Sequence, residues 1–185
     1  IVKRDGGYEG CNTDCTGFIS ELDAYGEEVK DRTVIMIGAG GAARAVAYAL
    51  KIKGVSCIYM LNRSVAKAKE TFDDMDFVNV LPLDGYAEIP DGRYLCVQCT
   101  SVGLAPHYDM APIEDKAFYR LVSTGIDLIY NPAVTKFMKN VADNGGKAYN
   151  GLKMLIGQAV ASYELFSNES IPADVTEALY EELDT

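Results

Sequence analysis

A glycine-rich turn after a predicted strand carries the clearest signal for ligand binding in this chain. The apolar run at residues 33–37 predicts a buried strand, and Gly38-x-Gly40-x-x-Ala43 follows it at the start of a predicted helix. Gly38 would make the tight turn, Gly40 would let a phosphate approach the backbone, and Ala43 would let the helix pack closely on the strand. The free N–H groups at the start of that helix attract anions. The pattern predicts a dinucleotide site, and the alternative is a plain tight turn.

The residues after the second predicted strand, 57–61, indicate which dinucleotide the turn would hold. A unit that binds NAD usually has a carboxylate here for the ribose hydroxyls, and this chain has none. It has Asn62-Arg63-Ser64 instead, with Lys67 one turn further on. The Arg63 guanidinium could pair with a 2′-phosphate, and the Ser64 hydroxyl could donate a hydrogen bond to it. The pattern favours NADP, and the alternative is a helix start with two solvated cations.

An aspartate at the start of another predicted helix is a candidate for acid–base chemistry. Residues 13–25 predict a helix, because apolar residues recur at spacings of four and three. Asp14 lies at its polar N-terminus, beside Asn12 and Thr13. From its position alone, Asp14 is either a helix cap or a proton-transfer group.

The cysteines and the single histidine indicate no metal site. An odd number of cysteines without a signal peptide favours free thiols in a reducing compartment, and we expect a cytoplasmic protein. Cys96 and Cys99 form a C-x-x-C, but they lie in an apolar run that predicts a strand. Residues three apart on a strand point to opposite faces, so both cysteines are expected to be small buried hydrophobes. His107 lies in a predicted surface loop at residues 104–116 and is expected to be solvated.

Predicted strands and helices alternate along most of the chain. The strands are expected at residues 33–37, 57–61, 77–81, 94–99, 125–129 and 147–149. After the helix at 13–25, the helices are expected at residues 42–53, 64–72, 133–143, 152–166 and 173–183, with Ser64 as an N-cap. This alternation predicts an α/β fold: a doubly wound, mainly parallel sheet with helices on both faces, which is Rossmann-like.

Composition and charge exclude several kinds of partner. Hydrophobic residues make up 49% of the 185 residues, which is enough for a buried core. The net charge of -10 makes nucleic acid and anionic membranes poor partners. No apolar run reaches the roughly 18 residues that a membrane helix needs. Much of the acidity is near the C-terminus, where it predicts a solvated helix face: Glu169, Asp174, Glu177, Glu181, Glu182 and Asp184.

Taken together, the motifs resemble those of the shikimate dehydrogenase family, in the family's order. The matching elements are Gly10-Cys-Asn12-Thr13-Asp14-x-x-Gly17-Phe18, Gly38-Ala-Gly-Gly-Ala-Ala-Arg44, Asn62-Arg63-Ser64-x-x-Lys67-Ala68, Thr100-Ser101-x-Gly103, Asp127-x-x-Tyr130-x-Pro132-x-x-Thr135 and Gly151-Leu-x-Met154-Leu-x-x-Gln158. Their joint occurrence is far more specific than any one of them. One departure is Gln98-Cys99, where the family has Asn-Ala before its Thr-Ser, and this could alter contacts near the nicotinamide ribose.

The resemblance implies roles for particular residues. Asp14 would be the catalytic aspartate beside the substrate hydroxyls, and Tyr130 and Gln158 would contact the substrate. Gly151 would lie near the nicotinamide amide. The residues implied to bind NADP are Gly38, Ala39, Gly40, Gly41, Ala42, Asn62, Arg63, Ser64, Lys67, Thr100, Ser101, Val102 and Gly151.

The resemblance also implies a domain organisation and a reaction. Residues 1–185 would be one NADP-binding domain: 1–30 the end of an interdomain linker helix region, 31–150 the Rossmann core and 151–185 C-terminal helices. The family's upstream substrate domain, with its catalytic lysine, has no counterpart in this chain. The parent would reduce 3-dehydroshikimate with NADPH, and this chain alone would be inactive.

Three points stay open at the level of sequence. The substrate could be quinate or another polyol acid, because the residues that discriminate lie mostly outside this chain. The chain could instead be a non-catalytic, regulatory NADP-binding module. The apolar side of the helix at 152–166 could also favour homo-oligomers.

Overall fold

The computed structural model describes residues 1–183, so the last two residues of the predicted domain, with Asp184, lie outside the described part. The described chain divides into two compact units. The larger unit is Val29–Gly151. The smaller unit joins Ile1–Glu28 to the chain from Leu152 onward.

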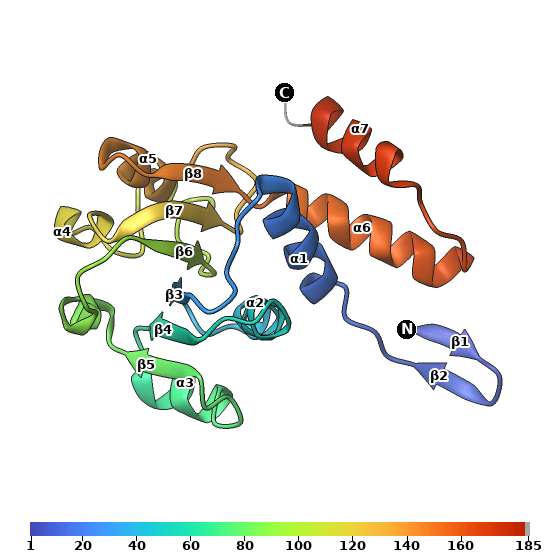
Figure 1. The fold of residues 1–185 in the computed structure, drawn as a ribbon, viewed down its shortest axis with the longest axis horizontal. Helices are drawn as coiled ribbons and strands as arrows, with labels where there is room; N and C mark the ends of the chain where they lie inside the picture. Colours follow the sequence, from blue (N-terminus) through green and yellow to red (C-terminus); the bar gives the residue numbers. More distant parts are fainter. Residues whose placement is uncertain (184–185) are drawn as a thin grey trace. The chain divides into compact units, whose positions relative to one another are not determined.

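The larger unit is built on a six-stranded parallel sheet. Its strands are β3 (Thr33–Ile37), β4 (Cys57–Leu61), β5 (Val78–Leu81), β6 (Tyr94–Gln98), β7 (Val122–Asp127) and β8 (Lys147–Asn150). The order is β5-β4-β3-β6-β7-β8, and Figure 1 shows it from β5 at the bottom to β8 at the top. The chain runs outward from β3 in one direction and then in the other, so the strand order reverses beside β3. The predicted doubly wound fold is confirmed.

Helices cover the sheet of the larger unit. They are α2 (Gly41–Ile52), α3 (Val65–Thr71), the short 3-10 helix η1 (Leu83–Glu88), α4 (Lys116–Tyr119) and α5 (Lys136–Asp143). Right-handed crossovers put α2 and α3 on one face and α4 and α5 on the other. Ile35 and Ile37 of β3 pack in one buried cluster with Phe118 of α4 and Phe137 of α5. Because strand residues alternate between faces, the fully buried Val34 and Met36 point to the other layer.

Three features of the larger unit differ from the sequence expectations. Strand β7 begins at Val122 and ends at Asp127, whereas the apolar run placed a strand at 125–129. Its first half contains Ser123 and Thr124, so the apolar-run criterion missed it. Helix α5 begins at Lys136 rather than at residue 133, because the Thr135 side chain caps it by accepting a hydrogen bond from the Met138 N–H. The sequence interpretation also missed η1 and α4.

The smaller unit is a pair of packed helices with two further elements. It contains the hairpin β1 (Val2–Arg4) and β2 (Gly7–Glu9), which was not predicted, and α1 (Asp14–Tyr25), α6 (Leu152–Ser167) and α7 (Ala173–Leu183). A Cβ atom on Gly17 would lie 2.5 Å from the Met154 carbonyl oxygen, and one on Gly157 would lie 3.0 Å from the Gly17 Cα. The two glycines therefore let the backbones of α1 and α6 approach closely.

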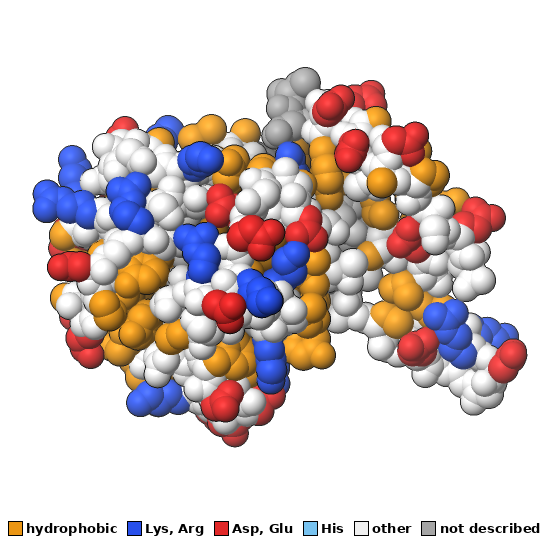
Figure 2. Space-filling model, in the orientation of Figure 1, with side chains coloured by type: hydrophobic (Ala, Val, Ile, Leu, Met, Phe, Trp, Pro, Cys, Tyr) orange, Lys and Arg blue, Asp and Glu red, His pale blue; other side chains and the backbone are white. Residues whose placement is uncertain are grey.

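The surface of α7 agrees with the predicted solvated acidic face. Asp174, Glu177, Glu181 and Glu182 are all exposed, and Figure 2 shows acidic side chains gathered over this helix. Across residues 1–183, no helix is long and apolar enough to cross a bilayer.

Candidate cofactor and substrate sites

The turn between β3 and α2 has the geometry that the glycine pattern predicts. Gly38 has a φ of 98°, and its N–H donates to the Leu61 carbonyl at 2.9 Å. A Cβ atom on Gly38 would lie 2.7 Å from Thr100 Cγ2, so the fold itself requires glycine there. At Gly40 the situation differs, because a Cβ atom there would meet no protein atom within 4 Å. Gly40 therefore keeps open the space in front of the first N–H groups of α2, where a phosphate would fit.

The segment after β4 presents two cations beside this turn. The Asn62 side-chain amide donates to the Ser64 carbonyl at 2.8 Å, which shapes the segment. Ser64 occupies the N-cap position of α3, as predicted, but its side chain makes no capping hydrogen bond. Arg63 and Lys67 are exposed.

Some cations of the larger unit are paired with carboxylates, whereas Arg63 and Lys67 are not. Arg44 pairs with Asp74 at 2.7 Å, and Lys136 pairs with Glu114 at 2.7 Å. Within residues 1–183, the Arg63 and Lys67 side chains have neither a hydrogen bond nor an ion pair. Two uncompensated cations after β4, the strand next to β3 in the sheet, suit a ligand with a second phosphate group.

The loops after β6 and β7 enclose a small, mostly apolar cavity. Its volume is about 300 Å³, and its walls are Ala42, Cys99, Thr100, Ser101, Leu104, Leu128, Ile129 and Tyr130. The structure thus brings together four of the predicted residues: Ala42, Thr100, Ser101 and Tyr130. Because the cavity lies at the carboxyl ends of parallel strands next to the order reversal, it is where ligands bind in open α/β sheets.

Gly151 lies at the same edge of the larger unit. A Cβ atom on Gly151 would lie 2.6 Å from the Leu128 carbonyl carbon, and its N–H donates to the Ile129 carbonyl at 3.3 Å. Close packing against the end of β7 therefore accounts for a glycine here. It also places Gly151 next to two residues of the cavity wall.

Asp14 and Gln158 belong to the smaller unit. Asp14 is the first residue of α1, and Thr13 holds the N-cap position, so Asp14 is not the helix cap. The Asp14 N–H donates to the Asn12 side chain at 2.8 Å, and its carboxylate is left partly exposed. Gly17 lies one turn further along α1, and a Cβ atom there would lie 2.6 Å from Gln158 Cγ on α6. The two predicted residues are therefore carried by adjoining turns of packed helices.

This helix pair buries a glutamate that was not predicted from the sequence. Glu21 has no exposed surface, and its Oε1 accepts a hydrogen bond from the Met154 N–H at 3.3 Å. Its Oε2 has no hydrogen-bond partner among residues 1–183, and burial raises the Glu21 pKa to about 8. The available signal was its position beside Leu22 and three residues after Phe18, on the apolar side of α1.

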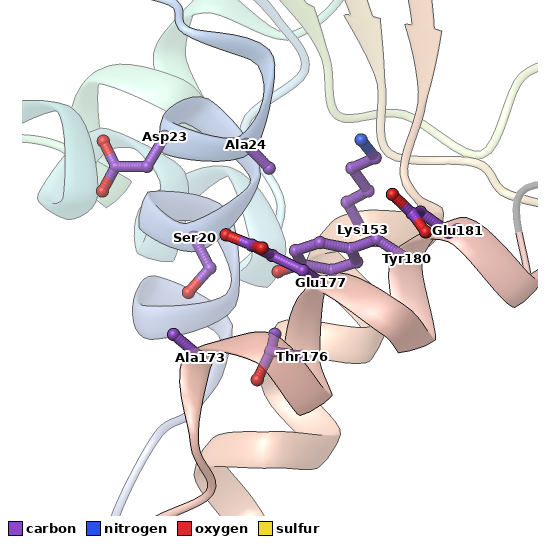
Figure 3. Close-up of a pocket in the computed structure, with 9 residues that line it drawn as sticks. All are labelled: Ser20, Asp23, Ala24, Lys153, Ala173, Thr176, Glu177, Tyr180 and Glu181. Carbon is purple, nitrogen blue, oxygen red and sulfur yellow. The ribbon is translucent and has the colours of Figure 1, made fainter.

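A larger cavity lies in the smaller unit, away from every predicted site residue. Its volume is about 640 Å³, and its walls are Ser20, Asp23, Ala24, Lys153, Ala173, Thr176, Glu177, Tyr180 and Glu181 (Figure 3). The Lys153 ammonium lies 4.5 Å from the Tyr25 ring centroid and 5.3 Å from that of Tyr180. These cation–π contacts tie α6 to α1 and α7.

The cysteines and the histidine form no cluster with a chemical role. Cys96 is fully buried in the core cluster, as predicted, and burial raises the pKa of its thiol. Cys99 was predicted to be buried within the strand as well, but it lies just beyond β6, in the cavity wall, and is partly exposed. His107 is exposed. In the part of the chain that the structure describes, no group of three or more His, Cys, Asp or Glu side chains could hold a metal ion.

Comparison with known proteins identifies the family. The model of the family described as Shikimate / quinate 5-dehydrogenase matches residues 21–101, and that of the Shikimate 5′-dehydrogenase C-terminal domain matches residues 151–179. The chain belongs to the shikimate dehydrogenase family. A curated member of the family from Carboxydothermus hydrogenoformans, a shikimate dehydrogenase (NADP(+)), is 37% identical over 181 residues. One with the same name from Caldanaerobacter subterraneus subsp. tengcongensis is 33% identical over 182 residues.

Solved structures of the family agree with these matches. A chorismate mutase/shikimate 5-dehydrogenase fusion protein from Clostridium acetobutylicum superposes with a TM-score of 0.89 at 35% identity, covering 98% of this chain and 64% of that one. A shikimate dehydrogenase in complex with NADP+ superposes with a TM-score of 0.79 at 30% identity, covering 98% of this chain and 65% of that one.

The chain is shorter than the family members that it matches. The alignments cover 95% of this chain and 64% of the Carboxydothermus protein, and 94% and 63% for the Caldanaerobacter protein. The chain thus spans slightly less than two thirds of the length of these relatives.

Proposed function

We propose that this chain is the NADP-binding part of an oxidoreductase that reduces 3-dehydroshikimate to shikimate. The open space at Gly40 beside the unpaired Arg63 and Lys67 is the observation that carries the proposal. Relatives named shikimate dehydrogenase (NADP(+)) and a neighbouring structure in complex with NADP+ support it.

Different residues of the larger unit bind different parts of the cofactor. The first turn of α2 binds the pyrophosphate through its free N–H groups. Arg63 pairs with the adenosine 2′-phosphate, while Ser64 and Lys67 add a hydroxyl donor and a second positive charge. The cavity beside Thr100, Ser101 and Val102 receives the nicotinamide, with Gly151 near its amide. When bound, NADPH supplies the hydride that reduces the substrate carbonyl carbon.

In the proposed reaction, the smaller unit handles the substrate. Asp14 works with the family's catalytic lysine, which has no counterpart in this chain, to move the proton at the substrate oxygen. Gln158 donates a hydrogen bond to the substrate, and Tyr130 is also assigned a contact with the substrate. Because this chain spans slightly less than two thirds of the length of its relatives, we expect the chain alone to bind NADP without turnover.

The substrate within this reaction class stays open. The matched family model is described as Shikimate / quinate 5-dehydrogenase, so quinate is the second candidate. Comparing turnover of the complete protein on shikimate and on quinate would decide between them. Self-association of this chain is a further expectation, because Leu155, Tyr163 and Phe166 of α6 are exposed, and sedimentation velocity would test it.

Calorimetric titration of the chain with NADP+ and with NAD+ tests the cofactor assignment. We expect clear NADP+ binding and much weaker NAD+ binding. Arg63→Ala should weaken NADP+ binding roughly ten- to hundredfold, because it removes charge-assisted hydrogen bonds to the 2′-phosphate, and should leave NAD+ binding unchanged. Lys69→Ala, which removes an exposed cation on α3, the helix that follows Arg63, is the matched control and should change neither affinity.

The other results of this titration are equally informative. Equal affinities for NADP+ and NAD+ in the unsubstituted chain would contradict the role of Arg63 but not the glycine turn. Binding of neither cofactor would contradict the proposal. Shikimate oxidation by the purified chain would contradict the expected inactivity.

A further inference from the structure

The ends of β6 and β7 are joined by a buried polar network that the proposed function leaves without a role. Gln98 and Asp127 are the last residues of these strands, and they are direct partners in the sheet register. Neither has exposed surface, and Thr135 is 1% exposed. Such burial is costly for polar groups unless every one of them is hydrogen-bonded.

Gln98 connects the network to the loop at residues 99–102. Its Nε2, which carries two N–H bonds, lies within hydrogen-bonding distance of three acceptors: the Asp127 carboxylate at 3.1 Å, the Val102 carbonyl at 3.2 Å and the Thr100 carbonyl at 3.3 Å. Its Oε1 accepts a hydrogen bond from the Thr100 N–H. The Thr100 hydroxyl then accepts from the Val102 N–H at 3.1 Å. The shape of this loop is therefore set largely by one side chain.

Asp127 and Thr135 in turn hold Gln98. The Asp127 carboxylate accepts hydrogen bonds from Gln98 and from the Ile129 N–H at 3.0 Å through Oδ1, and from the Thr135 hydroxyl at 2.6 Å through Oδ2. These bonds fix both carboxylate oxygens. Thr135 is also the N-cap of α5, so the network ends on a rigid element.

The sheet topology indicates which half of a dinucleotide this loop meets. Arg63 follows β4 on one side of β3, whereas residues 99–102 follow β6 on the other side. A dinucleotide whose pyrophosphate lies at the end of β3 extends to both sides of that strand. If Arg63 holds the 2′-phosphate of the adenosine, the loop at 99–102 faces the nicotinamide half.

We propose that Gln98 is a positioning residue that holds the loop at 99–102 in the shape that receives the nicotinamide half of NADP, with Asp127 and Thr135 keeping its amide in place. This inference rests on the proposed function. Gln98 acts through Thr100, Ser101 and Val102, because its own side chain is buried and satisfied within the protein.

The test compares two ligands by calorimetry, NADP+ and 2′,5′-ADP. The second ligand keeps the 2′-phosphate and adenosine but lacks the nicotinamide half. Gln98→Met preserves the side-chain length and removes the amide. It should weaken NADP+ binding about tenfold, because it removes the hydrogen bonds that fix the loop, and leave 2′,5′-ADP binding unchanged. Amide hydrogen exchange at Thr100 and Val102 should also accelerate in this variant without any ligand.

A second pair of variants keeps the test valid if Gln98→Met does not fold. Thr135→Val removes the hydroxyl and should weaken NADP+ binding selectively, whereas Thr135→Ser keeps it and should bind as the unsubstituted chain does. Val97→Ala is the control for a purely structural effect. This fully buried residue neighbours Gln98 on β6, so the variant should lower the melting temperature and change neither affinity.

Two outcomes would overturn the inference while the proposed function stands. One is unchanged NADP+ binding by Gln98→Met and Thr135→Val. The other is an equal loss of NADP+ and 2′,5′-ADP binding, which would indicate a general structural role. Failure of the unsubstituted chain to bind either ligand would overturn the proposed function and this inference together.

Discussion

At the scale of the residue, Gly38 and Gly40 of the same motif serve different purposes. Gly38 has a positive φ and lies against Thr100, so the folded protein needs it whether or not a ligand is bound. Gly40 has a φ of -85°, which any residue adopts, and open space where a side chain would be. The glycine pattern in the sequence does not reveal which glycine serves the fold and which serves the ligand, because that depends on what surrounds each Cβ position.

Alanine substitutions at these two positions should separate stability from binding. Gly38→Ala should lower the free energy of unfolding by about 1–3 kcal/mol, because the new methyl group meets Thr100 in an unfavourable backbone conformation. Gly40→Ala should change that free energy by less than about 0.5 kcal/mol. It should nevertheless weaken NADP+ binding, because the methyl group occupies the phosphate's space.

Urea denaturation and calorimetry measure the two effects on the same samples. A large loss of stability in Gly40→Ala, or NADP+ binding unaffected by it, would count against this division of roles.

At the scale of the element, the sequence predicted what depends on local pattern. The continuous apolar runs identified β3 and β4, and the glycine spacing placed the turn between β3 and α2. The sequence did not predict the full extent of β7. Ser123 and Thr124 are polar, and only the packing of neighbouring elements shields them from solvent. In the candidate cofactor site, the place of Arg63 directly after a strand was enough to propose it as a phosphate ligand.

Residues whose roles depend on distant partners could not be found in the same way. Glu21 and Met154 are 133 positions apart, and Gln98 and Asp127 are 29 apart. Nothing local to Glu21 indicates that its carboxylate meets the first turn of α6. Gln98 was noticed only as a departure from a motif, and its network required the sheet register.

The buried Glu21 should give the stability of the chain a measurable pH dependence. Its pKa is about 8 in the folded state, against an ordinary value of 4.5, so the folded protein keeps a proton that the unfolded chain releases. Stability from this group is therefore complete below about pH 4.5 and is lost as the pH rises towards 8, with a slope of at most about 1.4 kcal/mol per pH unit.

Glu21→Gln should remove this part of the pH dependence. The amide still accepts from the Met154 N–H but carries no charge, so the variant should match the unsubstituted chain near pH 4.5 and exceed its stability near pH 8. Glu177→Gln, at an exposed position on α7, is the control and should retain the original slope. Parallel pH profiles for Glu21→Gln and the unsubstituted chain would refute the assignment.

At the scale of the whole molecule, the division into two units separates the residues assigned to the cofactor from two of the three assigned to the substrate. The larger unit carries the residues assigned to the cofactor, from Gly38 to Gly151. The smaller unit carries Asp14 and Gln158, held by the close packing of α1 on α6. Damage to one unit should therefore leave the task of the other largely intact.

Gly17→Ala tests this separation. Its methyl group would lie 2.5 Å from the Met154 carbonyl oxygen, which should loosen α1 from α6. Hydrogen exchange should accelerate in these two helices, while protection of the six-stranded sheet and NADP+ affinity stay within about twofold of the unsubstituted chain. The control is Ala24→Gly, also on α1, which measures the loss of stability caused by any change in this helix. Gly26→Ala is unsuitable as a control because Gly26 has a positive φ. Loss of protection throughout the sheet would show that the units unfold together.

The pairing of α1 with α6 also has a consequence for synthesis on the ribosome. Because α1 is translated long before α6, its buried face, with Phe18 and Leu22, emerges without its partner. In the sequence, all residues of the larger unit come after α1 and before α6, so its synthesis is completed before that of α6. Once the larger unit has folded, α1 and α6 are joined by a compact unit instead of a long flexible chain. This lowers the entropic cost of bringing the two helices together. The nascent chain therefore acquires the unit assigned to the cofactor before the helix pair that carries Asp14 and Gln158.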